Sequence, residues 1–143
     1  MRSLVLKAYE QIRESGEIRL FKSYRDDYED GKQMRDFVYV KDIVNWMWFV
    51  YKNSHIKSGI YNMGFGRART WIDLATAIFN SLDREVNIHF IEMPEKIKNQ
   101  YQYFTEAKMK RLFQQKLPTP QWPLEPAVED YVVNYLEKNY EYI

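Results

Sequence analysis

Apolar residues recur every three or four positions at the start of the chain, with charged and amide side chains between them. The residues that carry this period are Leu4, Val5, Ala8, Tyr9 and Ile12. This spacing predicts an amphipathic helix. Ser15-Gly16 should end it, because glycine adopts the left-handed conformation that closes many helices. The apolar run at 18–21 then predicts a short strand.

After this strand, a charged segment at 24–34 is followed by one at 35–40 in which polar and apolar residues alternate. Residues 24–34 are rich in charge and end near the turn signal Asp30-Gly31, so we expect a surface loop. Residues 35–40 alternate polar and apolar side chains, which predicts a half-buried strand. Asp42 is placed to cap a following helix. The residues expected to face inward from that helix are Ile43, Val44, Met47, Trp48 and Tyr51.

The middle of the chain predicts a further strand, a turn and a helix. Residues 60–63 form the strand, and Gly64-Phe65-Gly66 follow as the turn. Thr70 and Asp73 have the spacing of a capping box, which marks the start of a helix. The apolar stripe of that helix consists of Ile72, Ala75, Ile78, Phe79 and Leu82.

Two more helices follow a fourth strand at 86–92. Thr105 is expected to cap a helix that runs through Leu112, and a last helix should begin at about Pro126. The prolines Pro118, Pro120 and Pro123 fix the loop between these two helices. The buried face of the last helix is expected to hold Ala127, Val128, Tyr131, Val132, Tyr135 and Leu136. Strands that alternate with helices predict an α/β fold.

Composition narrows the function. The 143 residues include 21 Lys and Arg against 20 Asp and Glu, two His and no Cys. Without cysteine there is no disulfide, thiol nucleophile or iron–sulfur site, and two isolated histidines do not make a metal site. A net charge of +1 argues against nucleic acid as a partner. No apolar run has the ~20 residues of a membrane helix, so we expect no membrane partner and a cytoplasmic protein.

Two local patterns resemble nucleotide-enzyme motifs but are incomplete. Gly64-Phe65-Gly66, between a strand and a helix, has two glycines of a dinucleotide loop, while Arg69 stands in the place of the third. We interpret it as a tight turn, although Arg67 and Arg69 could meet a phosphate. Tyr28 and Lys32 have the spacing of the Tyr-x-x-x-Lys pair, yet Asp30-Gly31 breaks the helix that this spacing needs.

Arg35 is the strongest candidate for binding an anion. It opens a predicted strand beside a charged loop, where a guanidinium can form two parallel hydrogen bonds with a phosphate or carboxylate. The alternative is a surface ion pair with Asp36 or Asp42. Separately, Tyr101, Tyr103 and Phe104 could line a binding cleft, because a phenol buries an apolar ring and keeps a polar tip. The alternative for these aromatic residues is half-buried packing.

Several segments together resemble the ADP-L-glycero-D-manno-heptose 6-epimerase family, a branch of the extended short-chain dehydrogenases. The segments are Lys22-Ser23, Gln33 to Asp42, Gly59 to Gly64, Met93-Pro94 and Tyr101 to Thr105. The chain is similar to the C-terminal, substrate-binding portion of this family, over residues 1–143. The resemblance implies an α/β part of a Rossmann-type fold that lacks most of the parallel cofactor-binding sheet. The strand at about 60–63 would belong to that missing sheet.

The resemblance also implies an isomerase that uses NADP to invert carbon 6 of an ADP-activated heptose, a precursor of the lipopolysaccharide core. Arg35 resembles the arginine that holds the sugar nucleotide, and Tyr101 a substrate-binding tyrosine. Lys7 stands where some members have a substrate-contacting histidine. The segment expected to contact the substrate consists of Phe21, Lys22, Ser23 and Tyr24.

In the family, the cofactor loop and the catalytic Tyr and Lys match positions upstream of Met1. We therefore expect no catalytic residue, no bound cofactor and no epimerase activity from this polypeptide alone. We also expect the chain to self-associate or to pair with a cofactor-domain polypeptide, because an unpaired apolar strand is a liability. The alternatives are a non-catalytic sugar-nucleotide binding module or pseudoenzyme, and a piece of another NAD-dependent nucleotide-sugar epimerase or dehydratase.

Overall fold

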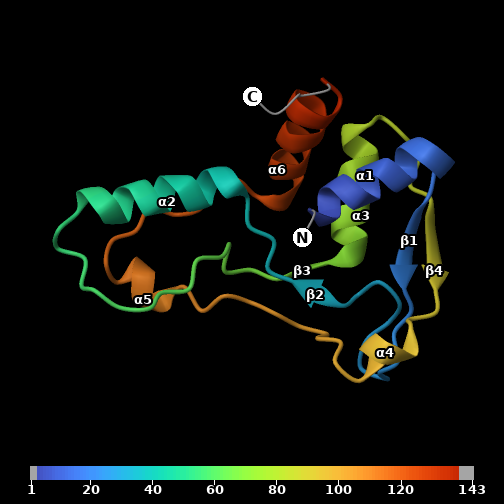
Figure 1. Ribbon diagram of the computed structural model, residues 1–143, viewed down its shortest axis with the longest axis horizontal. Helices are drawn as coiled ribbons and strands as arrows, with labels where there is room; N and C mark the ends of the chain where they lie inside the picture. Colours follow the sequence, from blue (N-terminus) through green and yellow to red (C-terminus); the bar gives the residue numbers. More distant parts are fainter. Residues whose placement is uncertain (1–2, 139–143) are drawn as a thin grey trace.

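Helices and short strands alternate along the computed structural model, which describes residues 3–138 (Figure 1). This alternation confirms the α/β prediction. The elements are α1 (Leu4–Ser15), β1 (Ile18–Phe21), β2 (Met34–Arg35), α2 (Val40–Lys52), β3 (Arg69–Thr70), α3 (Trp71–Ser81), β4 (Ile88–Ile91), α4 (Glu95–Lys98), α5 (Lys110–Phe113), α6 (Leu124–Tyr131) and a π-helical turn, η1 (Val132–Leu136).

The larger core lies where α1, α3 and α6 pack together beside β1 and β4 (Figure 1). The two strands are parallel, with Ile18 opposite Ile88 and Phe21 opposite Ile91. The fully enclosed side chains of this core include Ile12, Ile78, Phe79 and Val132. Burying apolar area of this kind is the main favourable term in folding. It fixes α1 and β1, which form one wall of the site described below.

Local signals set the ends of α1 and α3 as expected. Gly16 closes α1 at φ 74°, a left-handed conformation. At the start of α3, the Thr70 side chain accepts from the Asp73 backbone N–H, and the Asp73 carboxylate accepts from the Thr70 backbone N–H. This reciprocal pair confirms the predicted capping box. It places Trp71, the first residue of α3, immediately after β3.

A smaller core lies at the other end of the molecule, under α2 (Figure 1). Its buried members are Trp46, Met109, Leu112 and Leu117. The Trp46 indole N–H donates to the carbonyl oxygen of Pro118 at 3.0 Å. The Asp42 carboxylate, only 1% exposed, accepts from the backbone N–H groups of Gln121 and Trp122. Asp42 therefore anchors the proline-rich loop. The prediction that it caps its own helix is wrong.

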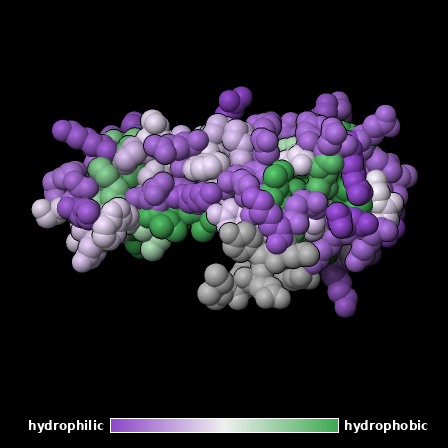
Figure 2. Space-filling view, turned by 90° about the horizontal axis from the view of Figure 1, so that it is seen from above, coloured by the Kyte–Doolittle hydropathy of each residue, from purple (hydrophilic) through white to green (hydrophobic). Residues whose placement is uncertain are grey.

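The predicted inward face of α2 is confirmed only at Ile43, which packs against the smaller core, and is wrong at the other four residues. Val44, Met47, Trp48 and Tyr51 are all exposed, and Tyr51 reaches 80%. Figure 2 shows hydrophobic side chains at the surface over the end of the molecule that carries α2. Trp46, on the opposite side of the helix, supplies the buried contact. The helix is apolar on more than one side, and the described residues cover only one of them.

Two of the predicted strands are shorter or absent. Within the described part of the chain, residues 60–63 form no strand, and Ile60 is 89% exposed. The strand predicted at 35–40 is reduced to β2, which pairs antiparallel with β3. A strand needs a neighbour to satisfy its backbone groups, and residues 60–63 have none here.

The C-terminal third departs from the expected boundaries. The segment after Thr105 is helical only at α5, because the Thr105 backbone N–H donates to the Met34 carbonyl and extends the contact between Met34 and Phe104. The fourth strand is limited to Ile88–Ile91. The last helix begins at Leu124, two residues before Pro126, and ends in η1. In the part of the chain that the structure describes, no helix is long and apolar enough to cross a membrane.

A carboxylate on α6 ties this helix to the start of α2. Asp130 accepts from the Lys41 ammonium at 2.5 Å and from the Tyr39 hydroxyl at 2.7 Å. The Lys41 ammonium also lies 4.8 Å from the centre of the Trp122 ring. Burial by itself raises the pKa of Asp130, but the hydrogen bonds from Lys41, Tyr39 and Asn134 outweigh it, so that its pKa is lowered.

Replacing Asp130 with asparagine is expected to lower the free energy of unfolding by about 1 kcal/mol near neutral pH, because three donors, Lys41, Tyr39 and Asn134, lose a charged acceptor. Since the folded pKa is lowered, this stabilisation is complete above the unfolded pKa of about 4 and is lost as the pH falls through the folded pKa. Urea titrations of Asp130→Asn and wild type at neutral and acidic pH test this. The exposed neighbour Glu129→Gln is the control, and a difference that stays unchanged in acid would contradict the prediction.

Candidate functional site

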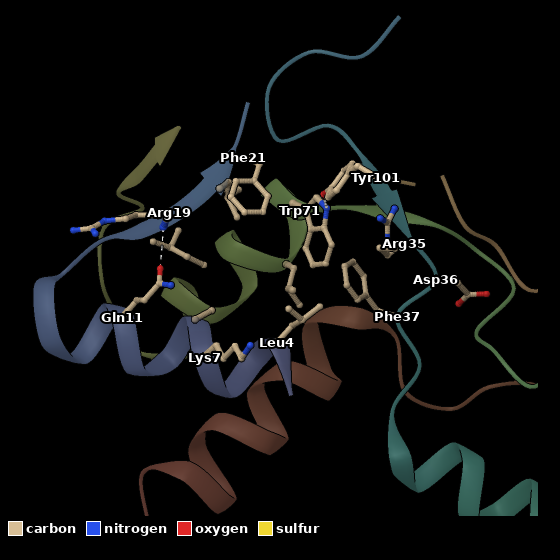
Figure 3. A pocket seen from close by; sticks show the side chains of 14 residues that line it. Leu4, Lys7, Gln11, Arg19, Phe21, Arg35, Asp36, Phe37, Trp71 and Tyr101 are labelled. Carbon is tan, nitrogen blue, oxygen red and sulfur yellow. Dashed lines mark hydrogen bonds between the residues drawn. The ribbon is translucent and has the colours of Figure 1, made fainter. Parts of the chain in front are cut away.

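A pocket of about 490 Å³ opens between α1, the end of β1, β2 and the start of α3 (Figure 3). Its floor is apolar and its polar groups lie around the rim. The residues that line it are Leu4, Lys7, Ala8, Gln11, Ile18, Arg19, Leu20, Phe21, Arg35, Asp36, Phe37, Trp71, Leu74 and Tyr101. Pockets of this size with a few convergent polar groups are typical of small-molecule sites.

Arg35 is held between two aromatic rings at this rim. Its guanidinium carbon lies 5.6 Å from the centre of the Trp71 ring and 5.3 Å from that of Tyr101. One of its N–H groups donates to the Met34 carbonyl oxygen at 2.8 Å. An arginine has five N–H donors. The remaining donors and the positive charge suit an anionic ligand such as a phosphate.

The surface ion pair considered for Arg35 is wrong, because both proposed partners are engaged elsewhere. The Asp36 carboxylate accepts from the backbone N–H groups of Phe65, Gly66 and Ala107. In Figure 3, Asp36 points away from Arg35. The Asp42 carboxylate is bound to the proline-rich loop. Arg35 thus has no carboxylate partner among residues 3–138, and its charge is balanced only by the two rings and a carbonyl.

Tyr101 completes this aromatic cluster. Its hydroxyl oxygen accepts from the Trp71 indole N–H at 3.0 Å, and its ring meets those of Phe21 and Tyr103 edge to face. Burial raises the pKa of the Tyr101 phenol, and the Trp71 hydrogen bond and the Arg35 charge offset this only in part. The phenol therefore stays protonated at neutral pH and can donate a hydrogen bond.

The helix α1 adds Lys7 and Gln11 to the opposite wall. Lys7 is exposed and lines the same pocket as Arg35 and Tyr101. The Gln11 amide oxygen accepts from the Arg19 backbone N–H at 3.0 Å (Figure 3). This hydrogen bond fixes the edge of β1 that faces the pocket. The site thus combines the cations of Arg35 and Lys7 with a phenol and an amide over an apolar floor, while Arg19, the third cation of the lining, pairs with Glu17 at 2.9 Å.

The structure separates the seven predicted site residues into two groups. Lys7, Phe21, Arg35 and Tyr101 line one pocket. Lys22, Ser23 and Tyr24 lie on the adjoining loop, outside the pocket lining.

On this loop, Lys22 pairs with Glu92 at 2.7 Å, which raises the pKa of the lysine. The Ser23 backbone N–H donates to Asp30, and the Tyr24 hydroxyl donates to Glu92. Lys22, the Ser23 backbone and the Tyr24 hydroxyl are therefore each bound to a carboxylate of Glu92 or Asp30.

Trp71 and Gln11 are site residues that the sequence did not indicate. Trp71 reads as the first residue of a capped helix, and nothing in its neighbours shows that its indole reaches Tyr101, 30 residues away. Gln11 reads as a polar position on an amphipathic helix. A polar side chain on the solvated face of a helix carries no signal for a ligand, so only the packing of α1 against β1 reveals it.

The residues that would hold a dinucleotide do not fit that role. The backbone N–H groups of Phe65 and Gly66, which would approach a pyrophosphate, are already bound to the Asp36 carboxylate. Arg69 pairs with Asp73 and with Glu125, at 3.0 and 2.5 Å. Gly64-Phe65-Gly66 therefore forms a turn closed by an internal carboxylate, and this chain offers no cradle there for a cofactor.

Residues 28–32 lack the catalytic geometry of the Tyr-x-x-x-Lys pair as well. They form turns instead of a helix, Lys32 pairs with Glu29, and the Tyr28 ring packs on Tyr103. No group of three or more carboxylates or histidines that could hold a metal ion occurs within residues 3–138. Polar and charged side chains of the described residues gather instead at the Arg35 pocket.

Comparison with known proteins identifies the family. The sequence model of the NAD dependent epimerase/dehydratase family matches residues 1–64, which include α1, β1, Arg35 and α2. An ADP-L-glycero-D-manno-heptose-6-epimerase of Nitratidesulfovibrio vulgaris is 49% identical over 95% of the chain, and one of Fusobacterium nucleatum is 45% identical over 100%. The chain belongs to this epimerase/dehydratase family. It spans 42% and 45% of the lengths of these two relatives.

Solved structures agree with this assignment. The heptose epimerase of Helicobacter pylori superposes with a TM-score of 0.72 at 25% identity, over 94% of this chain and 38% of its own. A UDP-N-acetylglucosamine 4-epimerase of Methanobrevibacter ruminantium gives a TM-score of 0.75 at 16% identity, over 95% and 40%, and supports the fold alone. The epimerase-family chain therefore has a Rossmann-like α/β fold that lacks most of the cofactor sheet.

Proposed function

We propose that this chain is the substrate-binding part of an ADP-L-glycero-D-manno-heptose 6-epimerase, and that it binds the ADP-activated sugar at the Arg35 pocket. The observation that carries the proposal is the position of the Arg35 guanidinium. It lies between Trp71 and Tyr101 without a carboxylate partner in the described residues, and faces a pocket that also contains Lys7. Two relatives of that name, at 45% and 49% identity, support the choice of substrate.

The pocket chemistry suits a nucleoside diphosphate linked to a sugar. The diphosphate carries negative charge, for which Arg35 and Lys7 provide the counter-charge. The apolar floor and the ring of Phe21 suit a nucleobase or a sugar face, because both can pack on aromatic surface. Cations on the rim and apolar surface below thus match the two chemical ends of such a ligand.

Epimerisation itself would need more than this chain provides. The family uses a nicotinamide cofactor, NADP in the resemblance described above, and the turn at 64–66 offers no place for it. We therefore propose that the chain alone is inactive and that it acts with a cofactor-domain polypeptide or in a self-associated form. The exposed apolar residues of α2 and the 89% exposed Ile60 support a covering partner.

Replacing Arg35 with alanine is expected to weaken ADP-heptose binding about tenfold or more, because a hydrogen bond to a charged group contributes ~1.5–3 kcal/mol. Calorimetric titration of the purified chain measures this, and light scattering on the same sample gives the assembled mass. Arg111→Ala is the matched control, since the Arg111 guanidinium also stacks on a tyrosine, Tyr61, but lies outside the pocket.

The outcomes separate the proposal from its rivals. Tighter binding of UDP- or GDP-sugars than of ADP-sugars would assign the chain to another nucleotide-sugar epimerase or dehydratase. Binding of ADP-heptose that Arg35→Ala leaves unchanged would move the site away from this pocket. A chain that binds none of the three sugar nucleotides would sink the substrate-binding function altogether.

A further inference from the structure

We propose that Trp71 is a positioning residue that orients the Tyr101 hydroxyl, so that this hydroxyl donates a hydrogen bond to the phosphate of the bound nucleotide beside Arg35. This inference rests on the proposed function, because it assigns a role within the same pocket. Trp71 itself makes no hydrogen bond to the ligand and acts only through Tyr101.

The position of the Trp71 ring is fixed by several neighbours. Its backbone N–H donates to the Gln33 carbonyl oxygen at 3.2 Å, and it begins α3 directly after the capping residue Thr70. Its ring meets Phe37 edge to face, with 5.3 Å between centres. The Arg35 guanidinium covers another side of the ring. The indole therefore has little freedom to turn away from Tyr101.

The direction of the hydrogen bond between the two side chains follows from their chemistry. An indole N–H can only donate, so the Tyr101 oxygen must be the acceptor in the 3.0 Å contact with Trp71. The phenol then has its own O–H left to donate. Among residues 3–138 no acceptor takes that proton, so Tyr101 reaches the pocket as a donor.

This polarity matches the other groups at the rim. Arg35 and Lys7 have only donors, and a phosphate oxygen has only acceptor sites at neutral pH. A phenol free to turn could accept or donate equally toward the pocket, whereas the Trp71 hydrogen bond occupies one acceptor site of the Tyr101 oxygen and holds it away from the pocket, which favours donation of the O–H to the ligand. Trp71 thus makes Tyr101 a donor toward an anion, like Arg35 and Lys7, and it does so from a ring that already packs under Arg35.

The test uses Trp71→Phe, which keeps an aromatic ring against Phe37 and Arg35 but removes the donor. ADP affinity is measured by calorimetry for wild type, Trp71→Phe, Tyr101→Phe and the double variant. We expect Trp71→Phe to weaken ADP binding about three- to tenfold. The double variant should bind no more weakly than Tyr101→Phe, because both changes remove the action of one hydroxyl. The exposed Trp48→Phe serves as the matched control and should bind like wild type.

A second readout tests the contact without any ligand. The chain has four tryptophans and therefore four indole N–H resonances in a proton–nitrogen NMR spectrum. The resonance that is missing in Trp71→Phe should move upfield in Tyr101→Phe, because its hydrogen bond is lost. This measurement needs only Tyr101→Phe and wild type to be folded once the resonance is assigned.

Each outcome decides a different claim. Losses in ADP affinity that add in the double variant, or Trp71→Phe binding like wild type, overturn the positioning role while the proposed function stands. An indole resonance that Tyr101→Phe does not move overturns the contact itself. Wild-type chain that binds no ADP overturns the proposed function, and the role of Trp71 toward a ligand falls with it.

Discussion

Replacing Trp46 with alanine is expected to lower the free energy of unfolding by about 3–5 kcal/mol, the range for removing a large buried aromatic side chain. Trp46 is 1% exposed and lies at the centre of the smaller core, against Met109, Leu112 and Leu117. Its indole N–H also satisfies the Pro118 carbonyl oxygen. Truncation leaves a cavity and an unpaired acceptor together, and urea denaturation followed by circular dichroism measures the loss.

The control for this prediction stands two residues further along the same helix. Trp48 is 56% exposed and contacts only side chains of its own helix, Tyr51 and Lys52, in the ring contacts described, so Trp48→Ala should cost less than about 1 kcal/mol. Trp46→Phe separates the two contributions, because it removes the hydrogen bond and keeps most of the ring volume. Equal losses for Trp46→Ala and Trp48→Ala would contradict the smaller core described for this end of the molecule.

The elements that the sequence predicted best are those whose signals are local. The period of apolar residues in α1, the glycine that closes it and the capping box of α3 all act within one or two helical turns. Such signals do not depend on what the rest of the chain does. The parallel pair β1 and β4 was likewise found as two separate runs, although its pairing joins segments some 70 residues apart.

The side of α2 that faces inward could not be predicted, because the helix has apolar residues on more than one side. The regular stripe of Val44, Met47 and Tyr51 suggested a buried face, yet these residues are exposed and Trp46 is buried. The period of apolar residues in α2 indicates a surface that is suited to burial, but it does not indicate whether the covering residues lie in the same chain. The strand predicted at 60–63 is wrong for the same reason, since the described residues provide no neighbouring strand for it.

The binding site divides in a similar way. Arg35 and Tyr101 were candidates from their own sequence surroundings as well as from the family resemblance, Lys7 from the resemblance alone, and the pocket brings all three together. Their mutual arrangement depends on where α1 and α3 pack, which local sequence does not determine. Trp71 illustrates the limit, because its position in sequence indicates only the start of a helix. Its contact with Tyr101 exists only once β2, β3 and the segment at 101–104 are assembled.

Replacing Asp36 with alanine is expected to cost about 3 kcal/mol of the free energy of unfolding, because its carboxylate serves three backbone N–H groups at once. The donors are Phe65 at 2.8 Å, Gly66 at 3.0 Å and Ala107 at 2.8 Å. They belong to two segments that lie between the larger and the smaller core. Loss of the carboxylate therefore leaves three donors without a protein acceptor and frees the junction between the cores.

The variant Asp36→Asn tests whether the negative charge matters at this junction. An amide of nearly the same shape has one acceptor oxygen, and its NH₂ group would face backbone donors, so most of the loss should remain. The exposed Asp26→Ala controls for removing a carboxylate of no structural role and should stay within about 0.5 kcal/mol of wild type. If Asp36→Ala also stays within that margin, the turn at 64–66 does not depend on Asp36, and the argument that an internal carboxylate closes this turn against a cofactor phosphate fails with it.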